Sequence, residues 1–229
     1  MRARAAALDE DALLEIAHLQ CAWRMTAGAA HSLNNALTAV TGLANVPGEE
    51  LELQRQLDRC IRISRSLTAH HAAHFGRTDE TELGGVLRRV TPALEDTLSR
   101  RFQLVTEAPP EPLHLEADPA RIELLVFLLV YRLADLARAD ARLRIAVSPG
   151  DKPETALLEL DLLGNELSAL ALDEVLDPAA APDAGSELSL EAASAVVASC
   201  GGSLAARPVP GGVRLRVILP ALDLDQAGD

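Results

Sequence analysis

The chain has 229 residues, of which 48% are hydrophobic, so it is long enough to bury a substantial core. Its 34 acidic residues exceed its 21 Lys and Arg residues, and the formal net charge of -13 excludes a sequence-independent grip on DNA or RNA. Only 2% of the residues are aromatic, which favours helix-rich packing of Leu, Ala and Val.

Residues 8–46 are predicted to form a first helix, because small and apolar residues recur there at alternating steps of three and four. This apolar stripe consists of Ile16, Leu19, Trp23, Thr26, Ala30, Leu33, Leu37, Val40 and Ala44. Pro47 and Gly48 break the helix, and a second helix is predicted from Glu49 to about Gly76. The apolar stripes of such a hairpin are too long for one pair of helices to cover. We therefore expect a homodimer with a four-helix bundle.

From residue 79 onward the pattern predicts a mixed α/β part. Its expected helices cover 83–98, 119–139, 167–176 and 188–200, and its expected strands cover 102–107, 112–117, 141–148, 155–163 and both sides of a turn at 210–212. Asp118 before Pro119 is a typical helix start. The predicted fold is thus an α/β protein in two parts: a helical hairpin over 1–78 and an α/β sandwich over 79–222. A polar tail over 223–229 is expected to be disordered.

The cysteines and the apolar runs indicate the cellular compartment of the protein. Cys21, Cys60 and Cys200 are odd in number and form no CxxC pair, which argues against a disulfide framework and a cysteine zinc site. The most hydrophobic run is interrupted by Arg132 and Asp135 before it reaches membrane-spanning length. We expect a cytoplasmic protein without a membrane anchor.

His31 is the candidate chemical residue of the first helix. A turn of about 100° per residue places it roughly 130° from the apolar stripe, so it should point outward. Its face carries mostly small or polar residues, which are the candidate docking surface for a partner: Arg24, Gly28, Asn35, Thr38 and Gly42. A helix selected only for stability would avoid the two glycines, so another backbone should come close to them. An exposed imidazole is mostly neutral near neutral pH and is therefore nucleophilic.

The segment AGAAHSLNNALTAVTG resembles the phospho-acceptor box of histidine kinases. The resemblance implies that His31 accepts a phosphoryl group on a dimeric hairpin. The residue after this histidine is usually Asp or Glu in the family, whereas here it is Ser32, and a serine hydroxyl is no base at neutral pH. Asn35 matches the position that orients water when such kinases dephosphorylate a partner.

The same resemblance extends over the second part, where the residues that would bind ATP are replaced. Leu128 and Arg132 stand where the family's two magnesium-binding asparagines would fall, and only Asp135 matches. In the stretch similar to the adenine-binding motif, Gly164 is kept but Leu162 and Glu166 replace the Asp and the second Gly. In the stretch similar to the glycine-rich lid, Gly185 is kept but Glu187 and Ser189 replace two glycines. A carboxylate in a glycine loop both blocks and repels phosphate. We expect the fold to be kept and the nucleotide site to be lost.

Two weaker patterns have ordinary explanations. His70, His71 and His74 could suggest a metal site, but a solvated helix end explains them without one. Arg55, Arg59 and Arg62 line one helix face and could meet an acidic partner or form intramolecular ion pairs.

The sequence therefore predicts a histidine phosphotransferase of the degenerate histidine-kinase type. His31 would relay phosphoryl groups between the aspartates of receiver domains, from an upstream hybrid histidine kinase to a response regulator. The chain itself should bind no cofactor, because magnesium would be held in the receiver. The alternative is a pseudokinase that docks a response regulator and dephosphorylates or sequesters it. An active ATP-dependent kinase would need the missing nucleotide motifs. A surface histidine without function and an unrelated α/β domain are the plainer alternatives.

Overall fold

The computed structural model describes residues 9–71, 75, 77–98, 102–137, 141–152, 154–164, 175–176 and 184–222, apart from the side chains of 66, 69–71 and 184–189. In chain order the elements are α1 (Glu10–Leu43), α2 (Glu50–His71), β1 (Asp79–Glu82), α3 (Leu83–Leu98), β2 (Phe102–Glu107), β3 (His114–Ala117), α4 (Pro119–Leu136), β4 (Ala141–Pro149), β5 (Thr155–Leu163), α6 (Ala184–Ser199), β6 (Ser203–Val209) and β7 (Gly212–Pro220).

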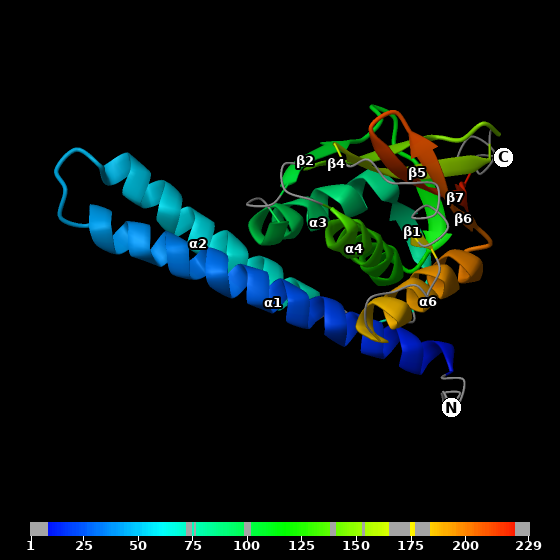
Figure 1. The fold of residues 1–229 in the computed structure, drawn as a ribbon, viewed down its shortest axis with the longest axis horizontal. Coiled ribbons are helices and arrows are strands. Elements are labelled where there is room, and N and C mark those ends of the chain that lie inside the picture. Colours follow the sequence, from blue (N-terminus) through cyan, green and yellow to red (C-terminus); the bar gives the residue numbers. More distant parts are fainter. Residues whose placement is uncertain are drawn as a thin grey trace.

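The first two helices form the predicted hairpin, which projects from the rest of the molecule (Figure 1). Asp9 starts α1, because its carboxylate accepts a 2.8 Å hydrogen bond from the backbone N–H of Ala12. α1 has 34 residues and α2 has 22. The N-terminal part of α1 therefore extends past the end of α2 and packs against α4 and α6 (Figure 1).

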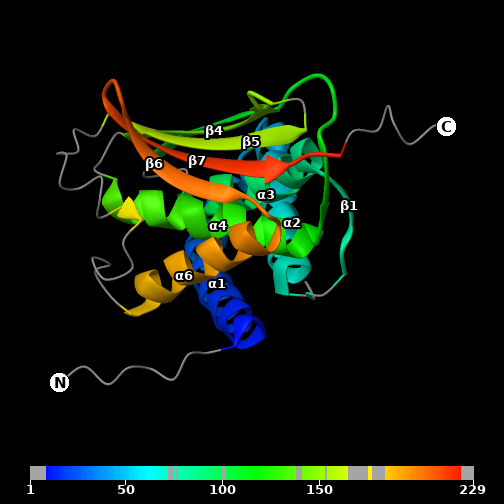
Figure 2. The same ribbon diagram turned by 90° about the vertical axis from the view of Figure 1, so that its right-hand side faces the viewer.

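The second part is built on a five-stranded sheet with the order β2-β4-β5-β7-β6. β2 and β4 are parallel, and the other neighbours are antiparallel. β1 and β3 form a separate antiparallel pair. Helices α3, α4 and α6 cover one face of the larger sheet, and α1 lies beyond them, away from the sheet (Figure 2). This arrangement is an α/β sandwich with the hairpin packed against its helical layer.

Helix α4 forms the centre of the core. Asp118 caps its start by accepting a 2.8 Å hydrogen bond from the N–H of Ala120, and Pro119 occupies the first turn, as predicted. From Leu124 to Ala134 every residue is buried. A helix that is apolar on all sides needs cover on all sides. The sheet lies on one side of α4, and α1 and α6 lie on the other (Figure 2).

Most predicted elements are confirmed, and the structure differs from the prediction at β1 and at the end of α4. The strand β1 was not predicted, because its sequence DETE lacks apolar alternation; it forms by pairing with β3, and the Thr81 hydroxyl donates to the Ala117 carbonyl at 2.8 Å. α4 ends at Leu136, before the predicted 139. The predicted tail and nearly all of the helix expected over 167–176 lie outside the described residues.

The covered face of α1 is a second stripe that the sequence analysis missed. It consists of Leu14, Ala17, Cys21, Ala22, Met25, Ala29, Ser32 and Ala36. The predicted apolar stripe is partly open, with Leu19, Trp23 and Leu37 exposed by 61%, 74% and 46%. α1 is thus apolar on two sides, and the chain itself covers the side that faces α2, α3, α4 and α6.

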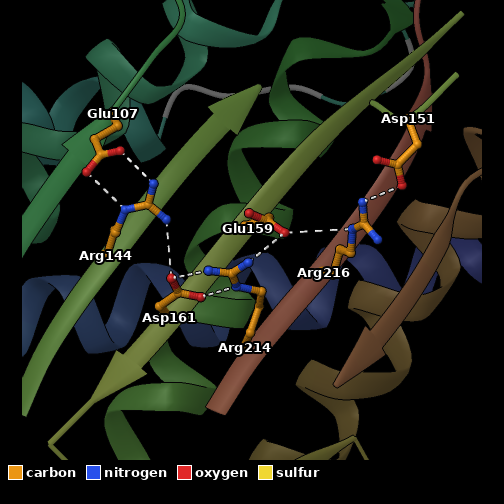
Figure 3. Close-up of polar contacts among 7 residues, drawn as sticks. All are labelled: Glu107, Arg144, Asp151, Glu159, Asp161, Arg214 and Arg216. Atoms are coloured by element: carbon orange, nitrogen blue, oxygen red, sulfur yellow. Dashed lines mark hydrogen bonds and ion pairs between the residues drawn. The ribbon is translucent and has the colours of Figure 1, made fainter. Parts of the chain in front are cut away.

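The outer face of the sheet carries a charged ladder, which we define as Glu107, Arg144, Asp161, Arg214, Glu159, Arg216 and Asp151 (Figure 3). Asp161 lies between two arginines: Arg214 donates to it at 2.6 and 2.9 Å, and Arg144 at 3.2 Å. The ladder connects β2, β4, β5 and β7 across the sheet and ends in the turn after β4 (Figure 3).

Candidate functional site

His31 lies in the C-terminal half of α1, and its side chain is exposed as predicted. At about 100° per residue, Gly28 lies roughly 60° from it towards the covered face, and Trp23 lies roughly 80° away on the other side. The imidazole therefore stands at the border between the covered face and the exposed apolar stripe.

Three of the predicted site residues continue along this side of α1 after His31. The Asn35 amide donates to the His31 carbonyl at 2.7 Å, which holds this side chain within one turn of the imidazole. The Thr38 hydroxyl donates to the carbonyl of Asn34 at 2.8 Å. A Cβ atom at Gly42 would meet no heavy atom within 4 Å, so this glycine has open space beside it. The docking roles of these residues remain predictions.

Gly28 has a different surrounding from the one expected. The close approach inferred from the glycine exists, but the neighbour is Thr97 of the same chain: a Cβ atom at Gly28 would lie 3.0 Å from the Thr97 Cβ and 3.1 Å from its Cα. The end of α3 can pack this closely on α1 only because Gly28 has no side chain. The prediction that a partner's backbone approaches Gly28 is therefore corrected.

Arg24 is likewise used within the chain. Its guanidinium donates to both carboxylate oxygens of Asp135 at 2.9 and 2.6 Å, and its central carbon lies 4.5 Å from the ring centre of Tyr131. Asp135 and Tyr131 stand one turn apart on α4. The sequence analysis placed Arg24 on a docking rim, whereas the structure places it in an ion pair between α1 and α4.

Ser32 is buried, although it follows an exposed histidine. Its hydroxyl donates to the backbone carbonyl of Asp96 in α3 at 2.5 Å. At the position where the resembled family usually carries an acid, this chain thus has a side chain that holds α1 against α3. The sequence shows that the acidic residue is replaced by Ser32, but it does not predict the contact with Asp96, because the two residues are 64 positions apart.

The carboxylate of Asp96 meets the second helix of the hairpin. It lies 3.7 Å from Arg59 and 3.8 Å from Arg62, and only 7% of its side chain is exposed. Burial raises the pKa of this carboxyl, while Arg62 and Arg59 act to lower it. For these two arginines, the alternative of intramolecular ion pairs is confirmed. Arg55 pairs with Glu52 of its own helix at 3.1 Å.

The positions that would bind nucleotide in the resembled family serve packing here. Leu128 is buried in α4, and Leu162 is buried on the helix-facing side of β5. Arg132 is 3% exposed, and its Nε donates to the Val175 carbonyl at 3.0 Å. None of these three side chains offers a carboxylate or an amide to a magnesium ion or an adenine.

The glycine-rich stretches are described only in part. Gly164 has a φ of 88°, which a glycine adopts without strain, and its N–H donates to the Gly211 carbonyl at 2.8 Å. The backbone of Gly185–Leu190 belongs to the first turns of α6. Glu166 and the side chains of Glu187 and Ser189 lie outside the described residues, so their predicted effects stay untested.

The two other histidines whose side chains are described, His18 and His114, have surroundings different from those of His31. The ring of His18 packs edge-on against Phe75 with a centroid distance of 5.2 Å, and His114 Nδ1 lies 2.8 Å from a carboxylate oxygen of Glu80. Within the described residues, no group of three or more His, Cys, Asp or Glu residues is placed to hold a metal ion. The side chains of His70, His71 and His74 lie outside those residues.

None of the helices that the structure describes has the length and apolar character needed to cross a bilayer.

Comparisons with known proteins identify the fold. The sequence matches no family model, and no curated protein matches it. The mycobacterial sensor histidine kinase MprB superimposes with a TM-score of 0.54 and 18% identity over 65% of this chain and 100% of its own. A bacterial phosphotransferase superimposes with a TM-score of 0.55 and 12% identity over 94% of this chain and 98% of its own. The histidine kinase ThkA, solved in complex with the response regulator TrrA, gives 0.53 and 17% over 86% of this chain and 61% of its own.

At these identities the likeness establishes the fold. The chain has a histidine-kinase-like fold, with an α/β sandwich like that of kinase ATP-binding domains. The long alignment with the phosphotransferase includes both the hairpin and the sandwich. We refer to residues 79–222 below as the kinase-like part.

Proposed function

We propose that this protein is a histidine phosphotransferase of a two-component phosphorelay, degenerate as a kinase. One observation carries the proposal: His31 is exposed on a histidine-kinase-like hairpin, while Leu128, Arg132 and Leu162, at three of the expected nucleotide positions, are buried in the chain's own packing. A chain that keeps the acceptor but lacks ATP ligands must obtain its phosphoryl group from another protein. Receiver domains of an upstream hybrid histidine kinase and of a response regulator are the partners that fit this chemistry.

The proposed transfer requires little from this chain besides a nucleophile. A ring nitrogen of His31 attacks the phosphorus of an aspartyl phosphate, the bond to the aspartate oxygen breaks, and the carboxylate leaves. The reverse reaction at a second receiver restores the free imidazole. Magnesium in the receiver's own site would neutralise the charge on the transferred group. The exposure of His31 suits a reaction in which the partner supplies the metal and the phosphate.

The partly open apolar stripe supports a homodimer in this proposal. Three large side chains of α1 and three of α2 are exposed in the single chain: Leu19, Trp23, Leu37, Leu51, Leu57 and Ile61. A monomer rarely leaves so many large apolar side chains in water along one hairpin. Pairing of two hairpins would cover them in a four-helix bundle.

The test uses radiolabelled receiver domains that carry phosphate on aspartate. The wild-type protein should acquire acid-labile, alkali-stable label, and the His31→Gln variant should acquire none. The melting temperature should be unchanged, because this side chain is exposed. His18→Gln is the matched control on the same helix and should become labelled like the wild type.

Labelling of the His31→Gln protein at the wild-type rate would refute the assignment. Calorimetry with Mg-ATP provides the second measurement, and we expect no measurable binding. Dissociation constants in the low micromolar range would contradict the loss of the nucleotide site.

Asn35 favours one alternative within the same architecture. Its amide is held one turn after His31, which suits the orientation of a water molecule. If the wild type never becomes labelled but accelerates loss of phosphate from a receiver, and Asn35→Ala abolishes that acceleration, the protein is a phosphatase of its response regulator.

A further inference from the structure

The kinase-like part is attached to the hairpin by a charged clamp, which we define as Arg24, Asp135 and Tyr131. Arg24 forms a two-pronged hydrogen-bonded ion pair with Asp135, and its guanidinium stacks over the Tyr131 ring. The side chains of Arg24 and Asp135 are only 34% and 24% exposed. Two parallel N–H···O bonds fix the angle between the groups as well as their distance. The clamp therefore sets how α4 lies on α1.

A second set of contacts reaches the turn of α1 that carries His31. Thr97 lies against Gly28, three residues before the histidine, and the Asp96 carbonyl accepts a hydrogen bond from Ser32, the next residue after it. The last turn of α3 thus touches α1 on both sides of His31 along the chain. Since residues 28–35 form one stretch of helix, these contacts restrict the rotation of α1 about its axis at the histidine.

The same turn of α3 also meets α2, because the Asp96 carboxylate lies close to Arg59 and Arg62. Both helices of the hairpin are therefore tied to one place on the kinase-like part. The clamp lies about two turns before His31 on the same helix.

We infer that the kinase-like part is a fixed support for His31, in which Arg24, Asp135 and Ser32 are positioning residues. The support holds the phospho-acceptor turn at one orientation, in which the side of α1 that faces α3 is closed to a receiver and His31 stays exposed at its border. This inference rests on the proposed function. It agrees with a partner that supplies the phosphate, because no part of this chain then has to move towards the imidazole.

The test reverses the charges of the clamp singly and together. Arg24→Asp and Asp135→Arg should each lower the rate of phosphoryl transfer from a saturating receiver by about ten- to a hundredfold, as for a small misplacement of a reacting group. The double variant restores the ion pair in the opposite direction and should recover most of the rate. Ser32→Ala removes one hydrogen bond without adding a charge and should give a smaller loss of the same kind. Arg142→Asp is the control, because Arg142 is an exposed residue of β4 and donates to Gln103 of the neighbouring strand.

Hydrogen exchange provides a readout that does not depend on transfer. Amide exchange over residues 28–35 should rise in both single variants and return towards the wild-type rate in the double variant. If exchange rises while the transfer rate per folded molecule stays at the wild-type value, the clamp is only structural and positioning is refuted. If neither measurement changes, the fixed support is refuted altogether. A wild type that accepts no phosphate refutes the proposed function, and the exchange measurement then still decides whether the support exists.

Discussion

The two glycines on the His31 side of α1 show how much a single residue depends on its surroundings. The sequence predicts the same role for both, because both lie within the first helix on the side of His31. In the structure Gly28 touches the end of α3, while Gly42 has open space around it. The outward direction of His31 follows from helix periodicity alone, but the neighbour of Gly28 depends on how α3 folds back. Local sequence therefore predicts the exposure and not the contact.

Replacement of the two glycines should have opposite effects. Gly28→Leu should lower the free energy of unfolding by about 1–3 kcal/mol, because the added side chain overlaps the last turn of α3. Gly42→Leu should raise it by up to about 1 kcal/mol, since a helical glycine is replaced in open space. Urea denaturation of both variants and the wild type measures this difference. Equal effects of the two replacements would contradict the packing of α3 on Gly28.

Asp96 should make stability depend on pH in the direction opposite to most carboxyls. Burial raises its pKa in the folded state, against the lowering effect of Arg62 and Arg59. The folded protein then holds this proton more tightly than the unfolded chain, so its stability contribution is present at low pH and is lost as pH rises through the raised pKa. The Asp96→Asn variant should therefore gain stability relative to the wild type as the pH rises from the ordinary aspartate pKa, about 4, towards neutral pH.

Urea midpoints over this pH range measure the Asp96 effect. Asp58→Asn, a change at an exposed position of α2, controls for the lost charge. If the stability of the wild type instead rises relative to that of Asp96→Asn as the pH rises, the effect of the two arginines on the pKa of Asp96 is larger than that of burial.

The charged ladder joins four strands through paired charges on the outer face of the sheet, which none of the described helices covers. Asp161 at its centre is 5% exposed, whereas Asp151 at its end is 84% exposed. Asp161→Ala should lower the free energy of unfolding by about 2–3 kcal/mol, because Arg144 and Arg214 lose a buried partner. Asp151→Ala should cost less than about 1 kcal/mol. Thermal denaturation of the two variants compares the positions, and equal costs would contradict the network.

The elements themselves were largely predictable where their patterns were strong. The apolar runs of β4 and β5, the cap at Asp118 and the break at Pro47 all have local causes, and the structure confirms them. β1 has no such local signal and exists through its pairing with β3. The charged ladder was also missed, because its pairs join strands that are far apart in the sequence.

The whole molecule has an unpaired apolar surface along the hairpin. Light scattering at tens of micromolar should show a dimer, as expected for an association free energy of about -8 kcal/mol. Trp23→Glu together with Leu37→Glu should give folded monomers, because both side chains are exposed in the single chain. Thr38→Glu, which also places an acid on the exposed side of α1, should leave the dimer intact. A wild-type monomer at this concentration would refute the four-helix bundle.

The architecture of two parts could be predicted from the sequence, but the way they are joined could not. The change of pattern near residue 79 marks the end of the hairpin, and the stretches that resemble kinase motifs mark the kinase-like part. The joining surface uses the second apolar stripe of α1, which includes small residues such as Ala17 and Ala29 that give a weak hydrophobic signal. The stripe of larger side chains gives the stronger signal, so the sequence predicted the buried face of α1 on the side that the chain leaves partly open.

Helix α1 belongs to both parts of the molecule, which affects how the protein unfolds and whether it can be divided into fragments. The N-terminal half of this helix completes the core of the sandwich, and the C-terminal half pairs with α2 (Figure 1). A cut near residue 78 would expose Leu14, Cys21 and Met25 on one fragment and the helices that cover them on the other. Each fragment would thus expose apolar side chains that are buried in the whole chain, so we expect a single calorimetric transition despite the two parts. Exchanging hairpins between such proteins would succeed only if the contact surface on the sandwich were exchanged with them.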